Sequence, residues 1–306
     1  MPTPHLKSYL HFQFIVFLWG FTAVLGALIT IEALPLVWYR MLLASFFVLL
    51  WILWKKKKLK VTRKMLGVLF VGGVVIAMHW LAFFEAVKVS NVSITLALLS
   101  TGAFFTSLME PIFYKRKIIV YELLFGLIVV GGLFLIFKVE TEYLKGMILA
   151  LSAAFLSAVF TLINGKIVHK EAPSVITFYE LFFGVLMVTL YVFYLSFQGR
   201  GFSADFFNLP TMDWIYILIL ALVCTAYAVV AAISVQKHLS PFTIMLSINM
   251  EPIYGIVLAL IVFGNEERMS AGFYVGAAVI LSVVILNGLL KTKFKIKRRV
   301  PKPPLK

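Results

Sequence analysis

The stretch that decides the fold is Pro35-Leu-Val-Trp-Tyr-Arg-Met-Leu-Leu-Ala-Ser-Phe-Phe-Val-Leu-Leu-Trp-Ile-Leu-Trp54, in which Arg40 is the one charged residue. A helix of about 20 such residues is long enough to cross the apolar core of a bilayer. A charge at that depth costs about 3 kcal/mol or more unless it faces protein, water or a partner. The stretch therefore predicts a membrane-spanning helix and makes Arg40 a candidate functional residue.

The composition of the whole chain indicates the same class of protein. Of its 306 residues, 62% are hydrophobic and 13% are charged, and the mean hydropathy is +1.02. A soluble domain of this size cannot bury so much apolar surface. The formal charge of +15 does not indicate a nucleic-acid partner, because the basic residues lie at span ends and in the tail, where they face cytoplasm and anionic lipid. The single cysteine, Cys224, cannot form an internal disulfide.

Apolar runs of this length recur along the chain. They predict an all-α integral membrane protein with ten transmembrane helices. We expect no inserted soluble domain, and the longest connection is Gln198–Asp213. The expected spans are roughly 10–30, 35–54, 65–86, 91–114, 120–138, 145–165, 173–197, 214–235, 241–263 and 271–290.

Lysine and arginine are distributed unevenly between the loops on the two sides of the membrane. With the N-terminus in the cytoplasm, 22 of the 28 lie on the cytoplasmic side and five outside, while Arg40 lies within a span. Basic residues concentrate in cytoplasmic loops. The asymmetry predicts that both termini are cytoplasmic, and we expect a multi-pass protein of the plasma (inner) membrane.

The two halves of the chain resemble each other. The second span begins with Ala33–Arg40 and the seventh with Pro173–Glu180, so both place an aromatic residue, a tyrosine and a charged residue at the same depth. Because each half has an odd number of spans, the halves cross the membrane in opposite directions. We expect two inverted five-helix repeats, at 10–138 and 145–290, followed by a basic cytoplasmic tail at 291–306. Inverted repeats are typical of carriers that alternate access to a central site.

The halves also resemble a known family. The residues that carry this likeness are Trp19-Gly20, Arg40, Ala86–Ser93, Glu251-Pro252 and Phe263-Gly264-Asn265-Glu266. Over residues 10–290 the chain is similar to EamA-type permeases of the drug/metabolite transporter superfamily. The first half departs from the family pattern, with Ala103 in place of a common proline and Tyr114–Lys117 in place of a Gly-Glu ending. The resemblance implies ten helices, inverted repeats and transport of small metabolites, without specifying the substrate.

Charged side chains within the spans are the first candidates for a site. Glu251 lies near the middle of the ninth span, and Pro252 beside it removes a donor and frees a backbone carbonyl. The Glu251 carboxyl group can bind a cation, a substrate amine or a proton, or it can form a structural hydrogen bond between helices. His79, in the third span, can carry a proton near neutral pH or hydrogen-bond to a substrate, and a structural hydrogen bond is again the alternative.

Arg40 and Glu180 lie at matching depths in the two halves. Arg40 can attract an anionic substrate group, reach outward to lipid phosphates, or pair with an acid to close a gate. Glu180 has the same gate and cavity alternatives. The full set of expected cavity and coupling residues is Glu251, His79, Arg40, Glu180, Asn249, Asn164 and the aromatic residues Trp19, Trp80 and Tyr227.

These observations predict a secondary active transporter that exports a small metabolite or drug-like molecule by alternating access. The expected partners are this substrate, membrane lipid and a coupled proton or other ion. The sequence contains no HExxH, Walker loop or Cys/His metal spacing, so we expect no catalytic residue, cofactor or metal. A membrane-embedded enzyme acting on lipid and a scaffold that transports nothing are the alternatives. The pattern Gly272-Phe-Tyr-Val-Gly276 favours close helix packing, within the chain or in a homodimer.

Overall fold

The computed structural model describes residues 4–115, 120–199, 201–239 and 241–293. Throughout this part of the chain the regular structure is helical, without strands. Seven helical stretches of the described residues are long and apolar enough to cross a membrane, and the described residues also include two shorter apolar helices. The stretches are Lys7–Leu28, Ala33–Trp54, Arg63–Val89, Val92–Tyr114, Thr141–Ile167, Pro173–Ser196 and Thr211–Val235, and the shorter helices are Ile128–Val139 and Ala271–Val283. The protein is therefore an all-helical, multi-pass membrane protein.

The helices follow one another along the chain with short connections. The first half contains α1 (Pro4–Leu28), α2 (Ala33–Trp54), α3 (Arg63–Val89), α4 (Val92–Leu99), α5 (Gly102–Tyr114) and α6 (Val120–Val139). The second half contains α7 (Leu144–Ile167), α8 (Pro173–Ser196), α9 (Ala204–Phe207), α10 (Thr211–Ala221), α11 (Ala228–Val235), α12 (Pro241–Ile248), α13 (Glu251–Phe263) and α14 (Ala271–Lys293). Three further segments are the 3-10 turns η1 (Thr141–Tyr143) and η3 (Gly264–Glu267) and the π-helical η2 (Leu222–Tyr227).

Two of the expected spans are each broken into two helices. The span expected at 91–114 consists of α4 and α5, and the span expected at 241–263 consists of α12 and α13. Between α4 and α5, the hydroxyls of Ser100 and Thr101 donate to carbonyls three residues earlier, at 2.5 and 2.7 Å. Such local bonds compete with the helical hydrogen-bond ladder. The second break falls at Asn249, about 149 residues after Ser100 at the first.

The eighth expected span contains a π-helical turn, η2, between α10 and α11. The Thr225 hydroxyl donates to the carbonyl of Leu220 at 2.7 Å, five residues earlier. A π turn inserts one extra residue into a helix and so rotates every later side chain by about 100° around the axis. The side chains after η2 therefore face directions that an unbroken helix would not give them.

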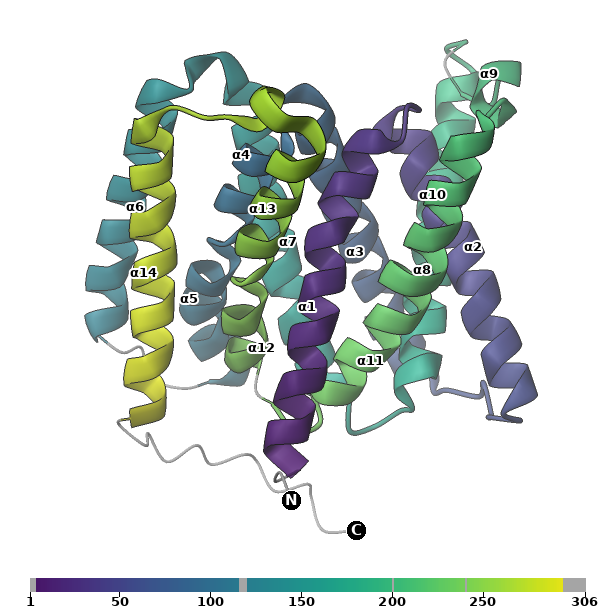
Figure 1. Ribbon diagram of the computed structural model, residues 1–306. Helices are drawn as coiled ribbons and strands as arrows, with labels where there is room; N and C mark the ends of the chain where they lie inside the picture. The colour runs from purple at the N-terminus through teal and green to yellow at the C-terminus, as the bar shows by residue number, and fades with distance from the viewer. Residues whose placement is uncertain (1–3, 116–119, 200, 240, 294–306) are drawn as a thin grey trace.

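α6 and α14 lie side by side at one edge of the bundle (Figure 1). Their contact is made through glycines, because a Cβ atom at Gly276 would lie 2.8 Å from the Gly132 carbonyl oxygen and 2.7 Å from Ile136. A Cβ atom at Gly272 would likewise meet Val139 of α6 at 3.0 Å. The 272–276 pattern thus packs within the chain and gives no support to a homodimer.

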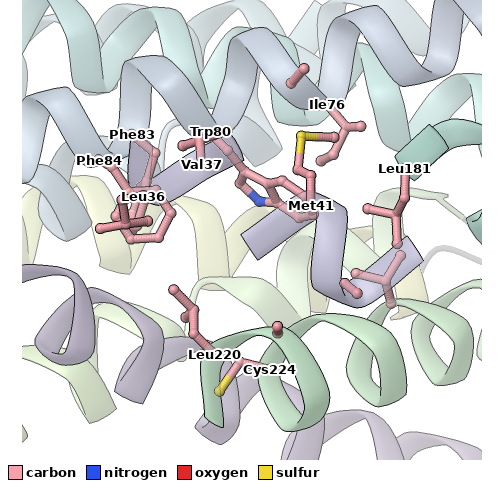
Figure 2. Close-up of a cluster of buried hydrophobic side chains, with 14 of the residues drawn as sticks. Leu36, Val37, Met41, Ile76, Trp80, Phe83, Phe84, Leu181, Leu220 and Cys224 are labelled. Atoms are coloured by element: carbon pink, nitrogen blue, oxygen red, sulfur yellow. The ribbon is translucent and has the colours of Figure 1, made fainter. Parts of the chain in front are cut away.

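The largest apolar core lies among α2, α3, α8 and α10, away from the α6–α14 pair. Figure 2 shows part of it, with side chains of Leu36, Val37, Met41, Ile76, Trp80, Phe83, Phe84, Leu181, Leu220 and Cys224. Cys224 is a buried free thiol in this core. The packing holds the part of α2 that carries Arg40 between α3 and η2.

α1 begins and α14 ends at the same end of the bundle, here called the terminal end, and the opposite end is the far end (Figure 1). At the far end, three buried carboxylates join segments of the first half to segments of the second. Each accepts backbone N–H groups: Asp213 from Thr30 and Ile31, Glu267 from Val92 and Ser93, and Glu140 from Ser270. A hydrogen bond to a charged group contributes about 1.5–3 kcal/mol, so these contacts join the two halves at the far end.

Candidate functional site

A cavity lies between the two halves, lined by side chains from α1, α2, α3, α4, α7, α11, α12 and α13. Its space for the centres of water molecules is ≈ 80 Å³, enough for several waters, since each needs about 10–15 Å³. The polar lining consists of Thr22, Arg40, His79, Ser157, Thr161, Gln236 and Glu251. Toward the terminal end, Gln236 and Ile244 complete the lining. The cavity therefore extends away from the three carboxylate contacts of the far end.

Arg40 is the largest fully buried side chain among the described residues and is 1% exposed. Its Nε donates to the Thr225 hydroxyl at 2.6 Å, and its guanidinium carbon lies 4.0 Å from the centre of the Trp80 ring. Among the described residues, the Nη1 atom has no hydrogen-bond partner. Arginine stays protonated in proteins, so the cavity wall carries a positive charge with donors to spare.

Glu251 also lines the cavity and is buried. It is the first residue of α13, directly after the break. Glu251 therefore does not lie within a continuous helix, contrary to the expectation from the sequence. A helix N-terminus carries partial positive charge and stabilises a carboxylate. Glu251 and Arg40 interact electrostatically without a direct ion pair among the described contacts. The cavity thus presents one cationic and one acidic side chain that do not neutralise each other by contact.

His79 reaches the cavity from α3. Its Nδ1 lies 2.8 Å from the carbonyl oxygen of Ala153 on α7. Because a carbonyl only accepts, Nδ1 must carry the hydrogen, and Nε2 is the acceptor of the neutral ring. This bond orients the imidazole and leaves Nε2 for a polar group of a bound solute.

The aromatic wall comes from Trp19 on α1 and Trp80 on α3. The Trp19 indole N–H donates at 3.3 Å to the carbonyl of Cys224, in the π-helical turn. Beside it, a Cβ atom at Gly20 would lie 3.0 Å from the backbone nitrogen of Gly255 on α13. The absence of a side chain at Gly20 therefore lets α1 and α13 approach closely on the wall of the cavity.

Four of the nine residues expected in the cavity lie outside its lining. Tyr227 is 44% exposed, and its hydroxyl lies 2.8 Å from His11 Nε2. Asn249 is buried at the break before α13, where its Nδ2 has no hydrogen-bond partner. Glu180 and Asn164 are buried next to each other, on α8 and α7. The other five, Trp19, Arg40, His79, Trp80 and Glu251, surround the cavity.

The expected residues did not include Gln236 and Phe160 of the cavity lining, or Thr225, which lies behind Arg40. Thr225 holds Arg40, Gln236 lines the cavity with an unpartnered Oε1, and Phe160 forms part of the wall. Thr225 stands among apolar residues, which is a weak signal of a role within the membrane. Gln236 lies at the end of a span, where polar residues are ordinary, and no sequence feature distinguishes Phe160. In the described residues, no group of three His, Cys, Asp or Glu is arranged to hold a metal ion.

The fold and the cavity define a multi-pass membrane protein with a partly polar cavity between its two halves. The family model for EamA-like transporters matches residues 7–138 and again residues 144–289, so two repeats cover nearly the whole chain. The protein belongs to the EamA-like transporter family, as the sequence resemblance indicated, and is thus a membrane transporter.

One solved structure is similar to this chain in its fold. It is described only as "Crystal structure of protein" and has a TM-score of 0.67 and 13% sequence identity. The similarity covers 94% of this chain and 99% of that one. A search of curated proteins finds no match.

Proposed function

We propose that this transporter exports a small charged solute by secondary active transport, alternating access to the cavity between the two sides of the membrane. The observation that carries the proposal is Arg40, a buried cation with an unpartnered nitrogen on the wall of a cavity. A buried donor of a charged group that lacks an acceptor is costly. An anionic group of a solute would supply the missing acceptor, and Glu251 across the same cavity would interact with a cationic group.

The proposed architecture is ten transmembrane helices arranged as two inverted five-helix repeats, at 10–138 and 145–290, with a basic tail at 291–306. Two observations support it. The family model matches the chain twice, and each half contains one span that is broken into two helices. Broken helices beside a central site are common in carriers built from inverted repeats, and here the second break directly precedes Glu251.

Export across the plasma membrane, with both termini in the cytoplasm, is the proposed direction. The basic residues favour a cytoplasmic terminal end. The cavity extends toward that end, whereas the far end is held by Asp213, Glu267 and Glu140. In this orientation the cavity is placed to take up a solute from the cytoplasm. A proton is the proposed coupled ion, because the chain carries acids within its spans and no nucleotide-binding domain is recognisable in its sequence.

The test is transport by the purified full chain in lipid vesicles, with a panel of labelled anionic, cationic and zwitterionic solutes and an imposed pH gradient. We expect accumulation of at least one charged class, its loss in Arg40→Gln, and its retention in Glu85→Gln. Glu85 is the matched control, because it also lies on a spanning helix but pairs with Lys145 at 3.0 Å and is 40% exposed. No transport of any class by folded protein, or equal transport by Arg40→Gln, would contradict the proposal.

The same vesicles test the two other classes that the sequence left open. An enzyme acting on lipid would change the lipid composition of the vesicles during incubation, and mass spectrometry of the extracted lipids would detect the change. A scaffold would leave both the lipids and the solutes where they were. We expect unchanged lipids and moved solute.

A further inference from the structure

A second buried polar pair lies apart from the cavity lining. Glu180 on α8 is 1% exposed and Asn164 on α7 is 0% exposed. The Asn164 Nδ2 donates to Glu180 Oε2 at 3.4 Å, near the upper limit for a hydrogen bond. The contact is therefore a weak one for a carboxyl group so far from water.

The remaining oxygen atoms of this pair have no partners. Glu180 Oε1 and Asn164 Oδ1 are both buried and form no hydrogen bond within the part of the chain that the structure describes. An ionised carboxylate and an amide oxygen can only accept hydrogen bonds, so the site has more acceptors than donors. An ionised carboxylate in such a place costs several kcal/mol without a partner. The pair thus lacks one positive charge or one hydrogen.

The described side chains around Glu180 supply neither a positive charge nor a hydrogen to the pair. Gly72 of α3 packs directly on the Glu180 carboxyl group, and a Cβ atom at Gly72 would overlap Oε1. Among the described residues, Asn164 is the one side chain with a hydrogen-bond or electrostatic interaction with Glu180. The ionisable side chains of the helices around it are Tyr39 and Arg40 on α2, Arg63, Lys64, His79, Glu85 and Lys88 on α3, Lys145 and Lys166 on α7, and Tyr179, Tyr191 and Tyr194 on α8. α11, which also packs on α8, has none.

The pair lies one helical turn from the cavity. Asn164 follows Thr161 by one turn on α7, and Gly72 precedes Ile76 by one turn on α3, and both Thr161 and Ile76 line the cavity. Both steps lead toward the terminal end, where α3 begins and α7 ends. The pair therefore lies on the same helices as the cavity. It is separated from the cavity lining by one turn, so it can bind an ion other than the transported solute.

We infer that Glu180, hydrogen-bonded to Asn164, is the binding site for the proton that this transporter couples to its solute. A proton on Oε2 turns that oxygen from an acceptor into a donor and makes the carboxyl group neutral. With the Asn164 amide flipped so that its oxygen takes the place of Nδ2, the O–H donates to the amide oxygen, and the buried pair carries no net charge. The proton arrives from water on one side of the membrane, breaks its bond to water, bonds to Oε2, and leaves to water on the other side.

A proton suits the site better than a metal cation. The pair offers three side-chain oxygens, whereas hard cations in proteins take about six or more oxygen ligands. Glu251 differs from Glu180 in having a cationic neighbour in Arg40 and a helix N-terminus. The two acids therefore have different roles. Glu251 interacts with the solute, and Glu180 binds the proton. This assignment rests on the proposed transport function for its purpose, but its binding step does not require a known solute.

Infrared spectroscopy of the full chain in phosphatidylcholine vesicles tests the binding step directly. The carbonyl stretch of a protonated carboxyl group is followed while the pH is changed, without any solute. We expect a protonated-carboxyl band in the wild type, its loss in Glu180→Gln, its shift in frequency in Asn164→Ala, and its retention in Glu251→Gln. Any of three results would overturn the inference. The band could remain in Glu180→Gln, its frequency could be unchanged in Asn164→Ala, or no protonated carboxyl could be detected at any pH at which the protein is folded.

Two further measurements keep the test decisive. If Glu180→Gln does not fold, Glu180→Asp keeps an acid in the site and must shift the band, and an unshifted band would again overturn the inference. Once the vesicle panel identifies a transported solute, Glu180→Gln is expected to retain solute exchange without a gradient and to lose accumulation driven by pH. If accumulation survives, the inference fails while the transport function stands. If no solute is transported, the infrared result still decides whether Glu180 binds a proton.

Discussion

The guanidinium carbon of Arg40 lies 4.0 Å above the ring of Trp80, while the Nε of the same side chain donates to Thr225 at 2.6 Å. One helix of the first half and the π-helical turn of the second half thus hold the cation from two sides. A desolvated cation over a tryptophan face gains about 2 kcal/mol or more. The arrangement fixes the direction of the charge while leaving Nη1 free for another acceptor.

We predict that Arg40→Lys folds but binds its solute at least about tenfold more weakly. Lysine keeps the charge but loses the planar fork and the Nε bond. The lost contact to a charged group is worth about 1.5–3 kcal/mol, and 1.4 kcal/mol corresponds to about tenfold in affinity. The measurement is the concentration dependence of uptake into vesicles. Thr225→Val removes the acceptor for Arg40 together with the hydroxyl's bond to the Leu220 carbonyl, and it should act in the same direction with a smaller effect. An unchanged affinity in Arg40→Lys would refute the role of the fork.

We predict that Glu251→Gln inserts and folds normally yet loses solute accumulation. Glutamine keeps the shape and hydrogen bonding of the side chain but removes the charge that faces the cavity. Glu251→Ala should also lose transport and be about 1–3 kcal/mol less stable, because it leaves the site vacant. The control is Glu266→Gln, at an exposed position of η3. Normal transport by Glu251→Gln would leave this side chain with a packing role only.

We predict that Gly276→Ala destabilises the protein by about 1–3 kcal/mol, because the new methyl group collides with Gly132 and Ile136 of α6. Gly131→Ala is the matched control, since no atom lies within 4 Å of a Cβ atom there. That substitution should be neutral or slightly stabilising. Thermal unfolding in detergent measures both. The oligomeric mass should be the same in all three proteins, and a change of mass in Gly276→Ala with unaltered thermal stability would place this contact between chains.

We predict that a cysteine introduced by Ser203→Cys, in a background without Cys224, reacts with an impermeant thiol reagent in intact cells. Ser203 is exposed at the far end, beside α9. A cysteine added after Lys306 should remain unreacted until the cells are opened. The opposite pattern would reverse the proposed orientation and with it the direction of transport.

The membrane class and the positions of the long helices could be predicted because each depends on the mean hydropathy of some 20 residues. The breaks at Ser100 and Asn249 could not, because the same averaging conceals one or two residues that leave the helix. Glu251 shows the consequence. Its position near the middle of an apolar run was readable, but its place at the start of α13 depends on the break before it.

The site was partly predictable for a related reason. A charge within the membrane must be enclosed by protein, which directs attention to Arg40 and Glu251 without any knowledge of helix rotation. The aromatic residues lack this constraint. Tyr227 lies at the end of the π-helical turn and is exposed rather than in the cavity, and only the rotation of each helix decides such cases. Glu180 was expected in the cavity, and its separation from the cavity by one turn depends on tertiary packing.

The crossing of α1 and α13 at Gly20 and Gly255 has a mechanical consequence. Cβ atoms added at these positions would lie 3.0 Å from the Gly255 nitrogen and 3.2 Å from the Gly20 oxygen, so two bare backbones face each other. Helices normally lock by fitting ridges of side chains into grooves, whereas here a glycine of each helix meets the backbone of the other. The crossing can therefore serve as a smooth pivot between the two halves. Because Trp19 adjoins the pivot and Glu251 lies one turn away, a small rotation there changes the shape of the cavity at once.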